Sequence, residues 1–414
     1  MLKSLFRRYE IFEYRKLFSM IVIIFYCIRV LASGWLAFDI EGHTIFQFII
    51  SMSGKIAMGI ALAYIICIQK KVTCKNMLLC LLPSIYIILI LMREEQSGFF
   101  AYSIVSIIAI YIFLLLSDEI KIKIVQVFYI VVLISIVICT FAYIYVLLGF
   151  PAKVVSYYTE TYITNYYYQF GPFAILSSDG LLRMCGLFNE GGNLGTTCAF
   201  LYAIFDKKNT KIEKIILIIG IALSFSLAGW ILLLLYWMCD SLQKGKIRNM
   251  LFAVAIIVTV LAVPKIDFGN IYINTFVQRF TISSDGLSGD NRTWKGFDRQ
   301  YDNTVTSEKK WWGQGLSYDL EDGSSYKSYI IIYGYLGTLI LALPWLLACI
   351  VKSSGNKQSL IFILLFFVSL YQRPAPITSL YGYAMMFGGL AIINMKWNKG
   401  EKCTVIAKNK RLKR

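Results

Sequence analysis

Charged residues, histidine and paired cysteines are scarce in this sequence. Of its 414 residues, 16% are charged, against roughly 25% in soluble domains. The only histidine is His43, and the ten cysteines stand singly with no Cys-x-x-Cys pair. We therefore expect no structural zinc, no disulfide framework and no cofactor, and interpret the cysteines as small buried apolar residues.

Long apolar runs are what the sequence has in abundance. Hydrophobic residues make up 58% of the chain, and they gather in blocks of about 20 residues, the length that crosses a bilayer as a helix. Because backbone amides in lipid must bond within their own segment, these blocks predict helices. The sequence thus predicts an all-α polytopic membrane protein, with one integral membrane domain over 1–414. The expected spans are 17–38, 46–68, 77–92, 99–116, 124–150, 194–206, 215–239, 249–264, 328–351, 360–371 and 379–395.

The basic residues lie mostly between these blocks, and their distribution indicates the topology. With a cytoplasmic N-terminus, the cytoplasmic segments hold 27 Lys and Arg residues, and the short loops of the opposite side hold two. We interpret the net charge of +17 as this topology signal and not as a nucleic-acid surface. Both termini are then cytoplasmic, and the basic tail 396–414 is expected to lie against anionic lipid.

One span does not fit as a single crossing. The segments 207–214 and 240–248 on either side of it are both basic, so both should be cytoplasmic. Ser224, Ser226 and Gly229 interrupt the apolar run between them, in SFSLAGW. Two half-crossings that meet at this interruption return the chain to the cytoplasmic side and give about twelve membrane segments. Broken helices are tolerated at that depth where they are buried in protein or line a wet cavity.

Two long loops then remain on the outer face, and the first, 151–193, ends in a glycine-rich turn before the sixth span. We assign Glu190 there as a general base and Arg183 as a diphosphate-binding cation. The glycines allow the backbone to approach a ligand closely, so Asn189, Gly191 and Gly192 are assigned to substrate binding. The alternative is an ordinary loop followed by a helix that starts at Asn193.

The second long loop, 265–327, carries arginines and aromatic residues. Arginine binds phosphate bidentately, and tryptophan and tyrosine offer a flat apolar face with a polar tip that suits sugars. The alternatives are solvated or ion-paired arginines and an aromatic belt at the membrane interface. The candidates are Arg292 as a catalytic cation, and Arg279, Arg299, Trp312, Gly313, Gly315 and Tyr326 as substrate-binding residues.

Two further cations, Arg29 and Lys55, fall inside expected spans at similar depth, and no Asp or Glu lies in the interior of any span. Intramembrane charges are usually functional, so the two are candidates for binding an anion such as a lipid phosphate. The alternative is that both side chains snorkel to the outer headgroups. The lack of intramembrane acids counts against a proton- or sodium-coupled transporter.

These motifs together resemble the Wzy-type O-antigen and capsule polysaccharide polymerases of bacteria. The family pattern is Arg, two residues, Gly, one residue, Phe, then Glu-Pro-Gly and a helix of small residues. Arg183, Gly186, Phe188 and Glu190 fit it, and Gly191 stands where proline is common. The SFSLAGW break resembles the family's Ser-x-x-Gly interruption. The second-loop pattern is matched by Arg279-Phe280, Arg292, Gly313-Gln-Gly315 and Gly334-Tyr-Leu-Gly337.

The related O-antigen ligases carry a histidine near the position of Gly323, where this chain has none. The resemblance therefore favours a polymerase over a ligase. It implies a metal-independent glycosyltransferase of the cell inner membrane that joins undecaprenyl-diphosphate-linked oligosaccharide repeat units at the outer face. It also implies a chain-length regulator membrane protein as a partner. The ligase remains one alternative, and a lipid-linked oligosaccharide flippase is the alternative that is not an enzyme.

The charge contrast predicts that both long loops lie on the outer side. Single cysteines placed at Ser178 and at Ser288, in an active variant without reactive native cysteines, should react with a membrane-impermeant thiol reagent in intact cells. Protection of both positions would contradict this topology.

Overall fold

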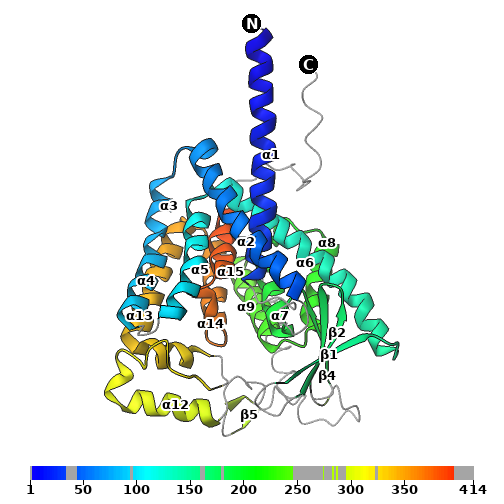
Figure 1. The fold of residues 1–414 in the computed structure, drawn as a ribbon. Coiled ribbons are helices and arrows are strands. Elements are labelled where there is room, and N and C mark those ends of the chain that lie inside the picture. The colour runs from blue at the N-terminus through cyan, green and yellow to red at the C-terminus, as the bar shows by residue number, and fades with distance from the viewer. Residues whose placement is uncertain are drawn as a thin grey trace.

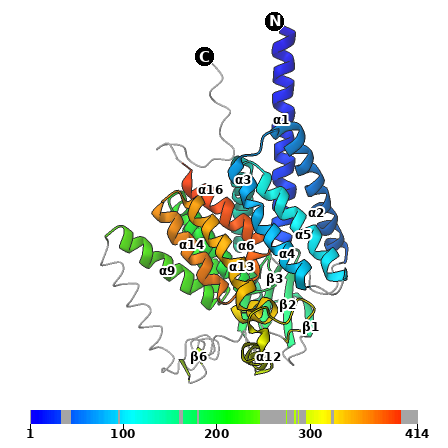
Figure 2. The ribbon, with the colours of Figure 1, turned by 90° about the vertical axis from the view of Figure 1, so that its left-hand side faces the viewer.

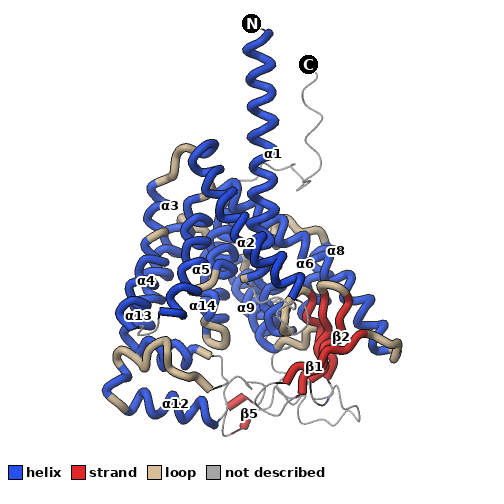
Figure 3. Tube along the Cα trace, in the orientation of Figure 1, coloured by secondary structure: helices blue, strands red, loops and turns tan. Residues whose placement is uncertain are grey.

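A computed structural model describes most of the chain and places it as a helical body that carries a small four-stranded sheet (Figure 1, Figure 3). Several predictions fall outside the described residues: the span 249–264, parts of the loop 265–327, the tail 396–414, Arg279, Arg292 and His43. The described residues are 2–33, 44–93, 97–158, 164–178, 181–245, 274, 282–283, 286–287, 295–321 and 325–395.

Most of the helices follow the apolar blocks of the sequence. Those before the sheet are α1 (Leu2–Ala32), α2 (Thr44–Tyr64) with its π-helical end η2 (Ile65–Gln69), α3 (Cys74–Leu79), α4 (Leu81–Arg93), α5 (Ser97–Leu115) and α6 (Asp118–Leu147). Those after it are α7 (Gly191–Phe205), α8 (Lys211–Leu223), α9 (Leu227–Gln243), α12 (Lys295–Thr306), η4 (Glu308–Lys310), α13 (Tyr326–Ser353), α14 (Lys357–Leu370), η5 (Ala375–Ile377), α15 (Leu380–Tyr383), η6 (Ala384–Gly388) and α16 (Gly389–Asn394).

The lengths and surfaces of these helices indicate a helical membrane protein. Four helical stretches in the described part are long and apolar enough to cross a bilayer: Met52–Gln69, Cys74–Met92, Asp118–Leu147 and Tyr326–Ser353. Shorter apolar stretches accompany them, among them Leu227–Gln243 and Lys357–Leu370. Large apolar side chains such as Ile66, Phe141 and Val351 are exposed on the helices, as expected for surfaces that face lipid. The total of twelve crossings stays a prediction.

Most of the stretch 151–193 forms a four-stranded antiparallel sheet in the order β1-β2-β3-β4, which was not predicted. Tyrosine, valine and threonine, which favour strands, are frequent in it. The predicted all-α architecture therefore describes the helical body but not this element. The strands are β1 (Lys153–Tyr158), β2 (Thr164–Phe170), β3 (Phe173–Ser178) and β4 (Leu181–Gly186), and β5 (Ile282–Ser283) pairs separately with β6 (Gly286–Leu287).

The predicted interruption in SFSLAGW is present as a break between two helices. Helix α8 ends at Leu223, and α9 begins at Leu227. Phe225 between them has a φ of 48°, which is unusual for a residue other than glycine. The Ser226 side chain then accepts a hydrogen bond from the backbone N–H of Gly229 and so caps the new helix.

The strands and the second-loop helix gather at one end of the helical body. Figures 1 and 2 both show β1–β4 and α12 at the end opposite the N-terminus of α1. Segments of the two long predicted loops therefore share one end of the molecule.

The break is packed against α7 so closely that only glycine fits. A Cβ atom added at Gly229 would lie 2.9 Å from the carbonyl carbon and oxygen of Gly195. A Cβ added at Gly195 would lie 2.7 Å from Ser224 Oγ. The backbones of α7 and α9 thus touch directly.

Adding a methyl group at this contact should destabilise the protein. We expect Gly195→Ala and Gly229→Ala each to lower the stability by about 1–3 kcal/mol, because neighbouring backbone must move. Gly59→Ala is the matched control, since no atom lies within 4 Å of its added Cβ. That variant should be stabilised by roughly 0.5–1 kcal/mol, the usual gain of alanine over glycine in a helix. Thermal unfolding in detergent measures all three, and equal effects at the three positions would contradict the close contact.

Candidate functional site

The candidate site begins where β4 turns into α7. Gly186, with a φ of 63°, ends the strand. The buried Tyr167 of β2 donates its hydroxyl hydrogen to the backbone oxygen of Asn189 at 3.1 Å. The Asn189 side chain accepts a hydrogen bond from Asn193 Nδ2, also at 3.1 Å. The sheet therefore holds the turn that presents Glu190 at the N-terminus of α7.

Arg183 lies beside this turn but is engaged with the helix break. Its Nε donates a hydrogen bond to the carbonyl oxygen of Ser224 at 3.2 Å. The last carbonyl groups of a helix have no partner within the helix, so Arg183 caps the end of α8. A Cβ added at Gly191 would meet the same Ser224 oxygen at 2.6 Å. Arg183 and Gly191 thus fix the position of α7 against the break.

Arg373, which the sequence analysis did not select, completes the cluster. Its guanidinium donates a hydrogen bond to Glu190 Oε2 at 2.5 Å and another to the side-chain oxygen of Asn193. The Arg373 side chain is 7% exposed and that of Glu190 41%. One signal was available: Arg373 is one of the two basic residues that the predicted topology places in short outer loops.

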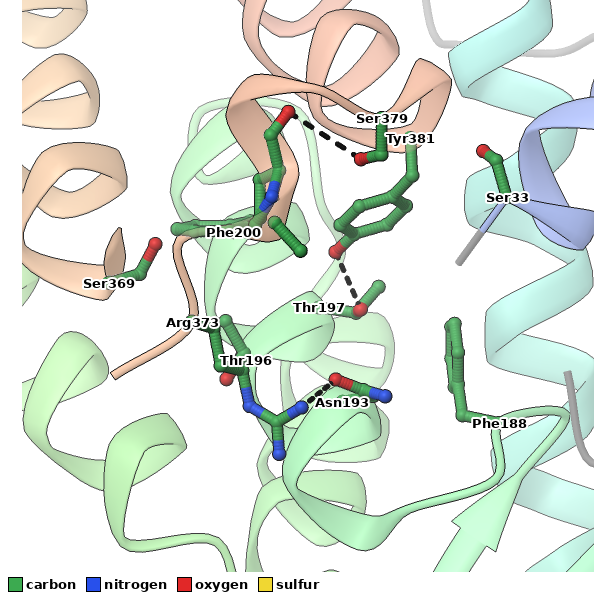
Figure 4. Close-up of a pocket in the computed structure, with 12 residues that line it drawn as sticks. Ser33, Phe188, Asn193, Thr196, Thr197, Phe200, Ser369, Arg373, Ser379 and Tyr381 are labelled. Atoms are coloured by element: carbon green, nitrogen blue, oxygen red, sulfur yellow. Dashed lines mark hydrogen bonds between the residues drawn. The ribbon is translucent and has the colours of Figure 1, made fainter. Parts of the chain in front are cut away.

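Arg373 and Asn193 line a pocket in the helical body (Figure 4). Its walls come from the end of α1, the first turns of α7, the end of α14 and the segment from Arg373 to Tyr381. The other lining residues are Ser33, Phe188, Thr196, Thr197, Phe200, Ser369, Ala375, Pro376, Ser379 and Tyr381. Figure 4 shows Arg373 reaching toward Asn193, and the Tyr381 hydroxyl meeting that of Thr197 at 2.7 Å.

The predicted residues of the second loop form a separate contact. The N–H of Gly315 donates to the oxygen of Ile332 at 3.1 Å, and the N–H of Leu336 donates to the oxygen of Trp311 at 3.0 Å. Gly334, with a φ of 69°, interrupts α13 at this place. A Cβ on Gly313 would lie 2.6 Å from the nitrogen of Gly334. Gly313 and Gly315 therefore attach the loop to the interruption in α13.

The aromatic and charged candidates of the second loop are distributed more widely. Trp312 is 41% exposed, and Arg299 is exposed on α12. Tyr326 stacks on Tyr371, with ring centroids 4.9 Å apart, and its N–H donates to the Tyr371 oxygen at 2.9 Å. Tyr326 thus supports the chain two residues before Arg373.

Arg29 and Lys55 are not placed alike. Arg29 is half-buried against α2, where a Cβ added at Gly54 would lie 2.9 Å from its Cδ. Lys55 is exposed on α2, as the snorkelling alternative requires. Arg29 lies one helical turn before Ser33, which lines the pocket.

Cys185 and Gly192 lie within the packed part of the cluster. Burial raises the pKa of the Cys185 thiol to about 12, so this cysteine stays neutral and acts as a core residue. Gly192 is buried in the first turn of α7. Within the described residues, no group of three or more His, Cys, Asp or Glu side chains is placed to hold a metal ion.

The contact between Arg183 and Ser224 predicts that Arg183 contributes to stability. We expect Arg183→Gln to lower the stability by roughly 1.5–3 kcal/mol, the usual contribution of a hydrogen bond from a charged group. Arg299→Gln is the control, since an exposed substitution usually changes stability by less than about 0.5 kcal/mol. Thermal unfolding in detergent compares the two variants. Equal unfolding temperatures would show that Arg183 does not cap α8.

Comparison with known proteins leaves this geometry as the main guide to function. No family model, curated protein or solved structure matches the chain. The resemblance to the Wzy-type polymerases therefore rests on the short motifs around Arg183–Gly195 and Gly313–Gly337.

Proposed function

We propose that the chain is a polysaccharide polymerase that joins undecaprenyl-diphosphate-linked oligosaccharide repeat units by glycosyl transfer. The observation that carries this proposal is the pair of Glu190 and the buried Arg373 beside a pocket in an apolar helical body. Glycosyl transfer from a lipid diphosphate needs a base for the acceptor hydroxyl and cations for the leaving diphosphate. The cluster offers both next to surfaces that suit a lipid.

The chemistry assigned to the cluster is a single displacement. The acceptor oxygen forms a bond to the anomeric carbon of the growing glycan as the bond from that carbon to the diphosphate oxygen breaks. The acceptor proton passes to Glu190, and the diphosphate leaves with its negative charge. The N-terminus of α7 and the neighbouring guanidinium both favour the charged form of Glu190, which is the form a base requires.

Arginines are proposed as the cations of this metal-independent reaction. Arg373 is in place in the pocket, and Arg183 lies in β4, beside the turn that carries Glu190, with its Nε engaged at Ser224. Arg279 and Arg292 are proposed to approach from the second loop. Planar guanidinium groups suit a diphosphate because they bind two oxygens at once.

The proposed setting is the cell inner membrane, with the sheet and α12 on the outer side and both termini in the cytoplasm. The shared location of β1–β4 and α12 at one end of the body supports this orientation (Figure 2). The concentration of basic residues in the segments on one side of the membrane supports this orientation independently. A chain-length regulator is the proposed protein partner, and anionic lipid is the proposed partner of the basic tail.

One assay tests the proposal against its rivals. Purified protein incubated with lipid-linked repeat units should give a ladder of products on a gel. Transfer to lipid A core without a ladder would identify a ligase. Movement of the lipid across vesicles with no new glycosidic bond would identify a flippase, and either outcome would overturn the polymerase.

In the same assay Glu190→Gln should lower the rate by roughly 10²–10⁴-fold, the usual contribution of general base catalysis. Glutamine keeps the size of the side chain but does not accept the proton. Glu308→Gln is the matched control, because Glu308 is exposed in η4. A Glu190→Gln variant as fast as the Glu308→Gln control would remove Glu190 from the base role.

A further inference from the structure

The pocket beside Arg373 contains a hydroxyl group that the protein leaves without a partner. Thr196 is 7% exposed and lines the pocket on the second turn of α7. Within the described part of the chain, its Oγ is buried and has no hydrogen-bond partner. A buried hydroxyl with no partner is costly, so its persistence at the wall of a pocket indicates a polar ligand.

The guanidinium of Arg373 indicates that this ligand is an anion. Its guanidinium lines the pocket and is bonded there to the Glu190 carboxylate and to Asn193. A guanidinium bonded to a carboxylate also fits a phosphoryl group, which offers the same kind of acceptor oxygens. The pocket is therefore suited to an anion with several oxygens.

The two partners of the ion pair differ in their freedom to move. Arg373 is 7% exposed, and its backbone N–H is bonded to the oxygen of Ser369 at 3.0 Å. Glu190 is 41% exposed, so its carboxylate is able to leave the ion pair and be solvated by water instead. Of the two side chains, Glu190 is therefore the one better placed to move when the anion on Arg373 is exchanged.

We infer that this pocket is a phosphate subsite in which Glu190 occupies Arg373 until a phosphoryl group displaces it. Arg373 then binds the phosphate oxygens, and Thr196 donates its hydroxyl hydrogen to one of them. The assignment of the phosphate to a lipid diphosphate rests on the proposed function, whereas the subsite itself does not. Displacement releases the Glu190 carboxylate from the guanidinium only when the donor is bound, so the base becomes available together with its substrate.

Binding of farnesyl diphosphate and of inorganic pyrophosphate to the full chain in detergent tests this subsite. Glu190→Gln should tighten binding by roughly tenfold, because the charged competitor for Arg373 is removed. Arg373→Lys should weaken binding by a similar factor, because the ammonium lacks the planar fork. A lipid diphosphate site binds farnesyl diphosphate more tightly than pyrophosphate, and a site for free phosphate binds the two alike.

Thr196→Val separates binding from folding. Valine has nearly the same shape, so the variant should unfold at the wild-type temperature or above it, since a buried hydroxyl without a partner is removed. It should nevertheless bind the diphosphate roughly fivefold more weakly. Thr140→Val is the matched control, because that hydroxyl bonds only the carbonyl oxygen of Ile136 in its own helix α6 among the described contacts.

Weaker binding in Glu190→Gln would overturn the exchange, since Glu190 would then be needed to hold Arg373 in its binding position. Diphosphate binding as tight as that of the wild type in Thr196→Val would overturn the role of the hydroxyl. If Arg373→Lys does not fold, Glu190→Gln and Thr196→Val decide the test. If Glu190→Gln binds the diphosphate more tightly but the wild-type protein makes no polymer in the gel assay, the phosphate subsite stands and the polymerase is rejected.

Discussion

The ion pair between Glu190 and Arg373 is the interaction on which the site depends. A guanidinium that is 7% exposed in an apolar helical body needs an anion beside it, because an uncompensated buried charge is very costly. The two residues are 183 positions apart in the chain. Their pairing therefore ties the segment after α14 to the N-terminus of α7, and the pocket lies between these two elements.

The position of α7 depends in turn on contacts between backbones. Gly195 touches Gly229 at the start of α9, and Arg183 and Gly191 meet the Ser224 carbonyl at the end of α8. The interruption of α13 at Gly334 is stabilised in the same manner by the backbone of Trp311–Gly315. Interrupted helices within an apolar body need partners from the protein itself, and in both places glycine and a neighbouring segment provide them.

Much of this arrangement could be predicted from local pattern. Apolar length predicted the helices, the basic segments on both sides of SFSLAGW together with its serines and glycine predicted the break, and the glycine-rich turn drew attention to Glu190. The sheet was missed because its tyrosine-rich strands were interpreted as a polar loop. Arg373 was missed because its partners are remote in sequence, and the contact of Gly313 and Gly315 with α13 was not predicted for the same reason. Local pattern does not show which distant segments meet, and that pairing decides whether a glycine or an arginine serves packing or binding.

We place Arg373 at the centre of an anion site whose resting occupant is a carboxylate of the protein itself. An experimental structure of the full chain with farnesyl diphosphate bound tests this most directly. We expect a phosphate within hydrogen-bond distance of the Arg373 guanidinium and the Thr196 hydroxyl, with the Glu190 carboxylate turned away from Arg373. A diphosphate bound elsewhere, with the pair of Glu190 and Arg373 intact, would contradict the account.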